Sequence, residues 1–164
     1  MLKLILILAS SGTTSFAILY FTGGVATPVF TNTLGAFVTI TMLFGALSFA
    51  LYNYLDGITK DLPKKLLKYN PDKYQNALNA LGALKREVIS NIILIIVLLL
   101  IERVLLGLNE VINGGDWKLP AWVGWSVISA RVACLVAGIY AALIQFRGFL
   151  TANELRTVLM NNGD

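Results

Sequence analysis

The chain of 164 residues contains no histidine and a single cysteine, Cys134. Without histidine, a zinc site with the usual nitrogen and sulfur ligands and a histidine general base are excluded or nearly so. One cysteine cannot form a disulfide within the chain. No spacing of Asp, Glu, Lys, Tyr or Ser resembles an assembled acid–base or nucleophile site. We therefore expect no catalytic residues, no metal site, no cofactor and no enzymatic activity.

Charged residues are scarce as well. They make up 13% of the chain against 57% hydrophobic residues, a composition far from that of a soluble domain. Four apolar runs have the length of a helix that crosses the hydrocarbon core of a bilayer. They cover residues 2–21, 34–54, 88–108 and 122–146. The sequence therefore predicts an all-α, multi-pass membrane protein that forms a single membrane domain over residues 1–164.

The stretch from Pro71 to Asn109 is the centre of the prediction, because no proline follows Pro71 within it and its glycines, Gly82 and Gly107, are isolated. Asn70 can serve as the N-cap, and Pro71 suits the first helical position, where its missing N–H costs nothing. A helix of about 39 residues would be nearly 60 Å long at roughly 1.5 Å per residue. That is roughly twice the hydrocarbon thickness of a bilayer. One half of this helix should therefore lie in lipid and the other half in water.

Residues 56–87 form the only sizeable polar region and are predicted to fold as a helical hairpin outside the membrane. Asp61, Leu62 and Pro63 should start a short helix within it. A second short helix is predicted at 151–160, where Thr151 and Glu154 form a capping box. The hairpin carries four acidic residues and seven basic ones, which are Lys60, Lys64, Lys65, Lys68, Lys73, Lys85 and Arg86.

Orientation follows from the distribution of positive charge. If the N-terminus is cytoplasmic, Lys3, the seven basic hairpin residues, Arg147 and Arg156 all lie inside, and only Lys118 lies outside. Lysine and arginine concentrate on the cytoplasmic side of membrane proteins. Both termini and the hairpin should therefore be cytoplasmic.

Glu102, Arg103 and Arg131 lie within the predicted spans. Placing an ionisable residue inside a membrane costs free energy, so such a residue indicates a functional site unless another role is found for it. The third and fourth spans run in opposite directions, which brings Glu102 and Arg131 to nearly the same depth, where they can meet. Arg103 should point about 100° away from Glu102 and be a poor partner. The pair can be a structural ion pair that joins two helices, or it can face a water-filled path.

Two polar stripes bear on that choice. Glu87, Asn91, Ile95, Leu98 and Glu102 share one face of the long helix, and Arg131, Gly138, Ala142 and Gln145 share a side of the last one. Polar groups along both helices favour a conduit, although Ile95 and Leu98 interrupt it. Because one chain has too few helices to enclose a pore, conduction would require a homo-oligomer.

The second span also has two interpretations. Phe37, Thr41, Phe44 and Ser48 recur at helical spacing and share a face. This face can be a packing seam between helices, or Phe37 or Phe44 can form a hydrophobic constriction that gates a channel by dewetting. The small polar block from Ser10 to Ser15 in the first span can likewise serve close helix packing or line a pore.

The basic hairpin can serve topology and attraction to anionic lipid headgroups. It can also bind an anionic ligand, because Tyr69 and Tyr74 lie on either side of Lys73. Lysines that contact phosphates and tyrosines that stack on bases are the ingredients of a surface for nucleotides or single-stranded nucleic acid. The candidate ligand-binding residues are Lys60, Lys64, Lys65, Lys68, Tyr69, Lys73, Tyr74, Lys85 and Arg86.

This plan of a few short spans and a small charged cytoplasmic element resembles the small transmembrane effectors of bacterial defence systems that act on the inner membrane when they sense a nucleotide signal. The resemblance is one of architecture. Together with the intramembrane charges and the basic hairpin, it leads to our main hypothesis, a homo-oligomeric pore or ion-channel-type effector in the inner membrane, gated by an anionic, possibly nucleotide, ligand at the hairpin. The alternative is a non-conducting scaffold or anchor subunit of a larger membrane complex.

Overall fold

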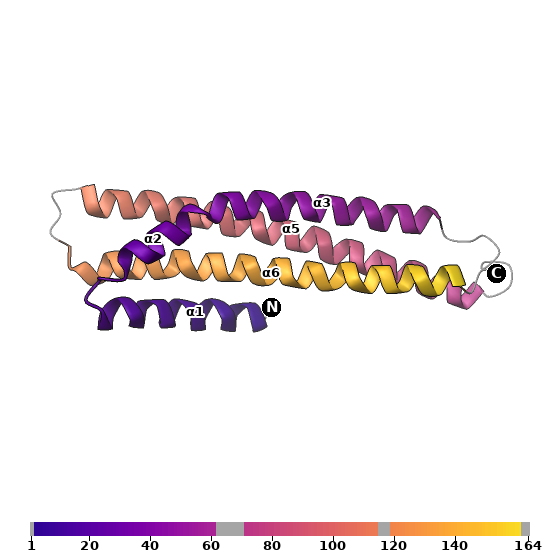
Figure 1. The fold of residues 1–164 in the computed structure, drawn as a ribbon, viewed down its shortest axis with the longest axis horizontal. Coiled ribbons are helices and arrows are strands. Elements are labelled where there is room, and N and C mark those ends of the chain that lie inside the picture. The colour runs from indigo at the N-terminus through magenta and orange to yellow at the C-terminus, as the bar shows by residue number, and fades with distance from the viewer. Residues whose placement is uncertain (1, 62–70, 115–118, 162–164) are drawn as a thin grey trace. The chain divides into compact units, whose positions relative to one another are not determined.

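The computed structural model describes residues 2–61, 71–114 and 119–161, and these ranges are helical almost throughout (Figure 1). The helices are α1 (Leu2–Phe21), α2 (Thr27–Gly35), α3 (Phe37–Lys60), α5 (Pro71–Gly114) and α6 (Ala121–Asn161). No strand occurs in the ranges described. The predicted all-α class is therefore confirmed for this part of the chain.

Four helical stretches are long and apolar enough to cross a membrane. They are Lys3–Phe21, Thr27–Lys60, Pro71–Ile112 and Ala121–Glu154. The first matches the predicted run 2–21 to within one residue, and the other three contain the predicted runs 34–54, 88–108 and 122–146. By length and composition, the chain is thus a multi-pass membrane protein.

The segment between the first two spans contains a helix that the sequence analysis missed. Gly23 and Gly24 have positive φ values of 56° and 84° and separate α1 from α2. Pro28 lies in the first turn of α2. Proline is tolerated there because the first N–H groups of a helix have no intrahelical acceptor. Ala36 then separates α2 from α3 and donates its N–H to the carbonyl of Thr33 at 3.2 Å.

Two helices extend further than predicted. Helix α5 starts at Pro71 as expected but continues to Gly114, past the predicted end at Asn109. The predicted short helix after Asp61 and the N-cap at Asn70 fall outside the described residues. Helix α6 runs without a break from the predicted span to Asn161, which corrects the expectation of a separate tail helix at 151–160. The hydroxyl of Thr151 donates to the carbonyl of Arg147 at 3.2 Å, so it supports a continuing helix and does not cap a new one.

The chain forms two compact units. Unit 1 comprises residues 1–42 and 94–140, and unit 2 comprises residues 43–93 and 141–164. Because α3, α5 and α6 each have residues in both units, neither unit is a continuous segment of sequence.

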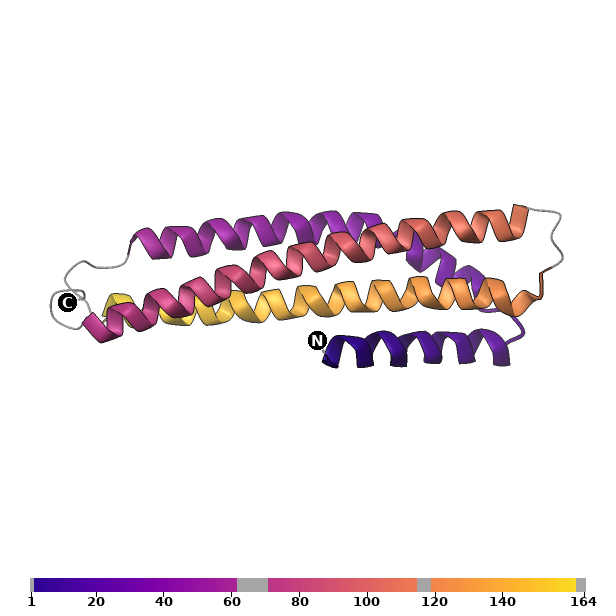
Figure 2. The same cartoon turned by 180° about the vertical axis from the view of Figure 1, so that it is seen from behind.

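In unit 1, α1 lies beside the first part of α6 (Figures 1 and 2). Gly24 packs directly against Trp125, and a Cβ atom at this position would lie 2.9 Å from Nε1 of the indole. Its positive φ and this close approach both require glycine. The main core cluster joins residues of α1, α2, α3 and α6, namely Leu19, Leu34, Phe37, Ile128, Val132 and Leu135.

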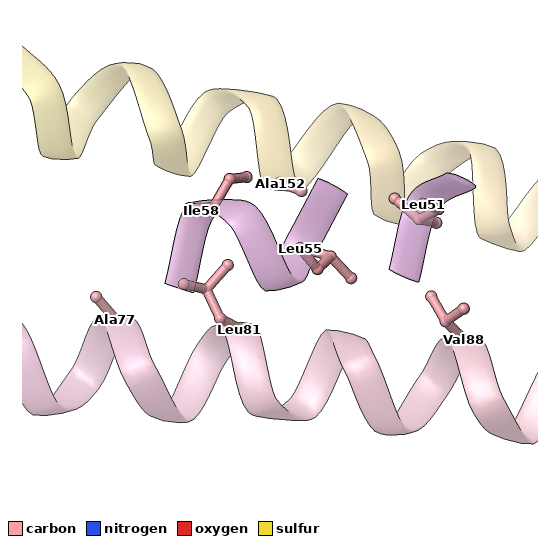
Figure 3. Close-up of a cluster of buried hydrophobic side chains, with 7 residues drawn as sticks. All are labelled: Leu51, Leu55, Ile58, Ala77, Leu81, Val88 and Ala152. Carbon is pink, nitrogen blue, oxygen red and sulfur yellow. The ribbon is translucent and has the colours of Figure 1, made fainter. Parts of the chain in front are cut away.

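In unit 2, α3 packs its apolar stripe against α5 and α6. Figure 3 shows the core cluster, which consists of Leu51, Leu55, Ile58, Ala77, Leu81, Val88 and Ala152. Leu55 and Leu81 are each 1% exposed. Burial of a leucine side chain stabilises a fold by about 1.5–3 kcal/mol. Three helices therefore hold this unit together largely through aliphatic contacts.

Tyr52 and Tyr54, near the end of the second span, are half-buried against the same cluster. The hydroxyl of Tyr54 donates to Oδ1 of Asn153 at 3.2 Å. Its ring packs on Phe149, with centroids 5.3 Å apart. Tyr54 therefore joins α3 to the C-terminal part of α6.

Candidate functional site

The most distinctive polar contact of unit 1 is the ion pair between Glu102 of α5 and Arg131 of α6. Nε and Nη2 of Arg131 both donate to Oε1 of Glu102, at 3.0 and 2.7 Å. The two side chains are only 2% and 7% exposed. The contact predicted from their matching depths on antiparallel spans is therefore present. Two charge-assisted hydrogen bonds to one oxygen fix the position of the guanidinium relative to the carboxylate.

Apolar side chains from the same two helices lie close to this pair in sequence. Leu98 precedes Glu102 by one turn of α5, and Cys134 follows Arg131 by three residues on α6. Leu98, Cys134 and Ala137 form a buried cluster. In such surroundings the effective dielectric constant is low, which strengthens the attraction and raises the cost of either charge alone.

The second carboxylate oxygen of Glu102 has a different environment. Oε2 is buried and accepts no hydrogen bond from the described residues. Nε of Arg103 lies 3.5 Å from it, close enough for an ion pair although too poorly aligned for a hydrogen bond. This corrects the expectation that Arg103 is a poor partner, because its long side chain reaches the carboxylate while remaining 48% exposed. One buried carboxylate thus lies next to two guanidinium groups, which leaves the site with a net positive charge.

The phenylalanines predicted as a constriction occupy different environments. Phe37 is 2% exposed in the core of unit 1, and its ring lies 3.7 Å from the position that a Cβ atom of Gly138 would take. Phe44 is half-buried in unit 2. Thr41 and Ser48, on the same predicted face, are 8% and 1% exposed. This face packs inside the chain, as the packing interpretation expects, and a gating role for Phe37 or Phe44 stays a prediction.

Hydroxyl groups in the first span bond to their own helix. Oγ of Ser11 donates to the carbonyl of Ile7 at 2.6 Å, and Oγ1 of Thr13 donates to the carbonyl of Ala9 at 2.8 Å. These bonds satisfy the hydroxyls locally, so they need neither water nor a second helix. Thr13 also borders an open, mostly apolar groove between α1, α5 and α6.

The sequence analysis missed one polar contact in unit 2. The Ser48 hydroxyl of α3 lies 2.8 Å from the side-chain amide of Gln145 on α6, and both are buried. Each residue was recognised on a polar or small face of its own span. Neither face indicated that a serine of the second span and a glutamine of the fourth would meet.

Two of the basic residues predicted to bind a ligand contact Asp56. Nζ of Lys60 lies 2.7 Å from Oδ2 and Nζ of Lys85 lies 2.8 Å from Oδ1 of this carboxylate. Lys85 also lies over the ring of Tyr52, 5.9 Å from its centroid. Tyr74, predicted to stack on a base, is half-buried against the core of unit 2. Lys60, Lys85 and Tyr74 therefore contact other residues of the same chain.

The remaining predicted ligand-binding residues are exposed or outside the described ranges. Lys73 and Arg86 are exposed. Lys64, Lys65, Lys68 and Tyr69 fall within 62–70, outside the described residues. Among the described members of the predicted set, the structure brings Lys60 and Lys85 together at one carboxylate.

Within the described ranges, no group of three or more Asp, Glu or Cys residues is placed to hold a metal ion. Comparisons with protein-family models, with curated proteins and with solved structures find no match to this chain. The candidate site is therefore defined by its own geometry, a buried carboxylate held by Arg131 and approached by Arg103.

Proposed function

We propose that the protein is a non-conducting scaffold or anchor subunit of a larger membrane complex, in which the Glu102–Arg131 pair holds α5 against α6. The observation that carries this proposal is the direct, buried contact between the two charges inside one chain. Charges that line a conducting path must face water. Here they face each other, and Leu98, one turn before Glu102 on α5, is buried with Cys134 and Ala137.

In this proposal the protein lies in the inner membrane with both termini and the 56–87 hairpin in the cytoplasm. The ten-to-one bias of basic residues supports that orientation. The exposed basic residues at the hairpin, among them Arg86, would then meet anionic headgroups or a partner protein. The scaffold would act by holding partners at the membrane, and no chemical step is required of it.

Purification in mild detergent followed by native mass spectrometry tests the scaffold proposal. We expect wild-type protein to retain a partner protein and Arg131→Ala to lose it, because the variant leaves Glu102 unpaired and loosens α5 from α6. Glu110→Gln changes an exposed acid on the same helix and is the matched control that should retain the partner. Recovery of wild-type protein without any other protein would contradict the proposal.

A second candidate is a homo-oligomeric pore effector gated by an anionic ligand at the hairpin. The observation that favours it is the buried Oε2 of Glu102, which has no hydrogen-bond donor among the described residues. A buried ion pair with an unsatisfied oxygen is a poor source of stability compared with apolar packing. Its presence would be explained if α5 and α6 separate in an open state and expose both charges to water.

Planar-bilayer recording distinguishes the two candidates. The pore predicts conductance when short single-stranded oligonucleotides or cyclic nucleotides are added to the hairpin side, and a change of ion selectivity in Glu102→Gln but not in Glu110→Gln. The scaffold predicts no conductance under any of these conditions. Ligand-dependent conductance that is identical in wild-type and Glu102→Gln protein would remove the ion pair from the pore mechanism.

A further inference from the structure

A small cavity in unit 2 is bordered by two side-chain amides. Its volume is about 10 Å³, which is roughly the space that one water molecule needs. Asn91 of α5 and Gln145 of α6 border it, together with Glu87 and Gly148. The amide nitrogens of Asn91 and Gln145 are buried and have no hydrogen-bond partner among the described residues. Buried polar groups in proteins are normally paired with protein atoms or ordered water.

The contacts of Ser48 determine how the Gln145 amide is oriented. Oγ of Ser48 lies 2.6 Å from the carbonyl oxygen of Phe44 and 2.8 Å from the atom assigned as Oε1 of Gln145. A hydroxyl has one proton to donate, and a carbonyl oxygen can only accept. Ser48 must therefore donate to Phe44 and accept from Gln145. The two ends of a side-chain amide are assigned from such contacts, so Nε2 of Gln145 faces Ser48.

This orientation changes what the cavity contains. With Nε2 of Gln145 bonded to Ser48, Oε1 takes the buried position that has no partner. Asn91 then presents an N–H donor to the cavity, and Gln145 presents an acceptor. Neither group bonds directly to the other in the structure. A donor on α5 and an acceptor on α6 therefore border one water-sized space.

We propose that this cavity is a binding site for a single water molecule that bridges α5 and α6. The water accepts a hydrogen bond from Nδ2 of Asn91 and donates one to Oε1 of Gln145. Its second proton is available to Glu87, which borders the same cavity. Two to four polar partners are what a buried water requires. The site is independent of both functions proposed above.

The chemistry of the lining favours water over an ion. A carboxylate residue at the rim, Glu87, repels an anion, and the buried N–H donor of Asn91 needs an acceptor, which a metal cation does not supply. The space also admits no larger polar ligand, since its volume is about 10 Å³. A neutral molecule that both donates and accepts fits this lining.

Water NOE and ROE spectroscopy of ¹⁵N-labelled protein in deuterated detergent tests the site without a mutation. We expect the Asn91 side-chain amide to show a cross-peak to the water resonance, of opposite sign in the two experiments, as a directly bound, long-lived water gives. Gln75 is the matched control, because its amide is on the same helix but exposed, where it contacts Asn79 at 3.5 Å. The cross-peak of the Gln75 amide should have the pattern of signs that short-lived surface water gives.

Two results would overturn the proposal. One is the absence of a water cross-peak at the Asn91 amide, and the other is a peak with the same sign in both experiments, which indicates direct exchange of the amide protons with water or brief contact with surface water. The Gln145→Leu variant adds a second measurement, because it removes the acceptor and leaves Asn91 in place. We expect the Asn91 cross-peak to fall at least several-fold in this variant, and an unchanged peak would exclude the bridge.

Discussion

Units 1 and 2 each contain a buried polar contact that involves α6, and the two contacts differ in charge. In unit 1, Arg131 of α6 pairs with the carboxylate of Glu102. In unit 2, Gln145 of α6 meets the hydroxyl of Ser48. Both positions on α6 are at least nine-tenths buried. A buried charge depends far more on its partner than a buried amide does, because an unpaired ion cannot be left in a low-dielectric interior at small cost.

The largest expected effect tests this dependence directly. Arg131→Leu leaves Glu102 buried without its main partner and should lower the free energy of unfolding by about 3–5 kcal/mol. The measurement is reversible unfolding in mixed detergent micelles, followed by circular dichroism. Arg103→Leu is the control, since this arginine is half exposed and lies 3.5 Å from the carboxylate, and it should cost no more than about 1 kcal/mol.

The double variant Glu102→Leu/Arg131→Leu completes this test. Removing both charges leaves no unpaired ion, so its stability should equal that of the wild type or exceed it by up to about 4 kcal/mol. If the double variant is as unstable as Arg131→Leu alone, the loss of stability comes from altered packing. The unpaired charge of Glu102 is then not its cause, and the proposed difference between the charged and the neutral contact is contradicted.

A second prediction asks whether unit 2 depends on aliphatic packing where unit 1 depends on charge. Leu81 is 1% exposed between α3 and α5. Leu81→Ala should lower the free energy of unfolding by about 2–5 kcal/mol, through lost burial and the cavity left behind. The same unfolding measurement applies, with Leu100→Ala as the control, because Leu100 is 60% exposed. Equal losses in the two variants would show that burial at Leu81 is not the cause.

A third prediction concerns the neutral contact. Gln145→Leu removes a buried amide that is only partly satisfied, while Ser48 keeps its bond to the carbonyl of Phe44. We expect the free energy of unfolding to change by no more than about 1 kcal/mol. A loss as large as that of Arg131→Leu, in the same assay, would mean that the two polar contacts do not differ as proposed.

The smallest expected effect lies at Asp56. Lys85 is 20% exposed in its contact with this carboxylate, and Lys60 is 76% exposed. Lys85→Met should lower the unfolding temperature slightly, because the side chain also lies over Tyr52. Lys60→Met should leave it unchanged, since exposed ion pairs contribute little. A larger shift for Lys60→Met than for Lys85→Met would reverse the order expected from burial.

Much of the fold could be predicted because helices in apolar runs depend on local patterns. The four spans, the start of α5 at Pro71 and the meeting of Glu102 with Arg131 all follow from run length, a proline position and depth counted along antiparallel helices. Local patterns do not reveal where a helix ends when no strong breaker is present. The capping box at Thr151 therefore suggested a new helix, although α6 passes through it.

The candidate site was predicted in part for the same reason. The approach of Arg103 to Glu102 depends on side-chain rotation, and a helical wheel describes only where a side chain leaves the backbone. The contact of Ser48 with Gln145 depends on how α3 packs against α6, which no spacing within either helix encodes. Tyr74 is of a residue type that can stack on a base, but it is half-buried because it packs against the core of unit 2.

The sequence by itself determined that this is a helical protein with four membrane-length apolar stretches and which charges lie inside them. Hydrophobic run length and residue type act locally, so they can be interpreted without coordinates. Only the tertiary structure decided that Arg103 also approaches Glu102, that Phe37 lies in a core, and that Asn91 and Gln145 border one small cavity. The distances in such contacts depend on the rotation of side chains and on the rotation and packing of whole helices.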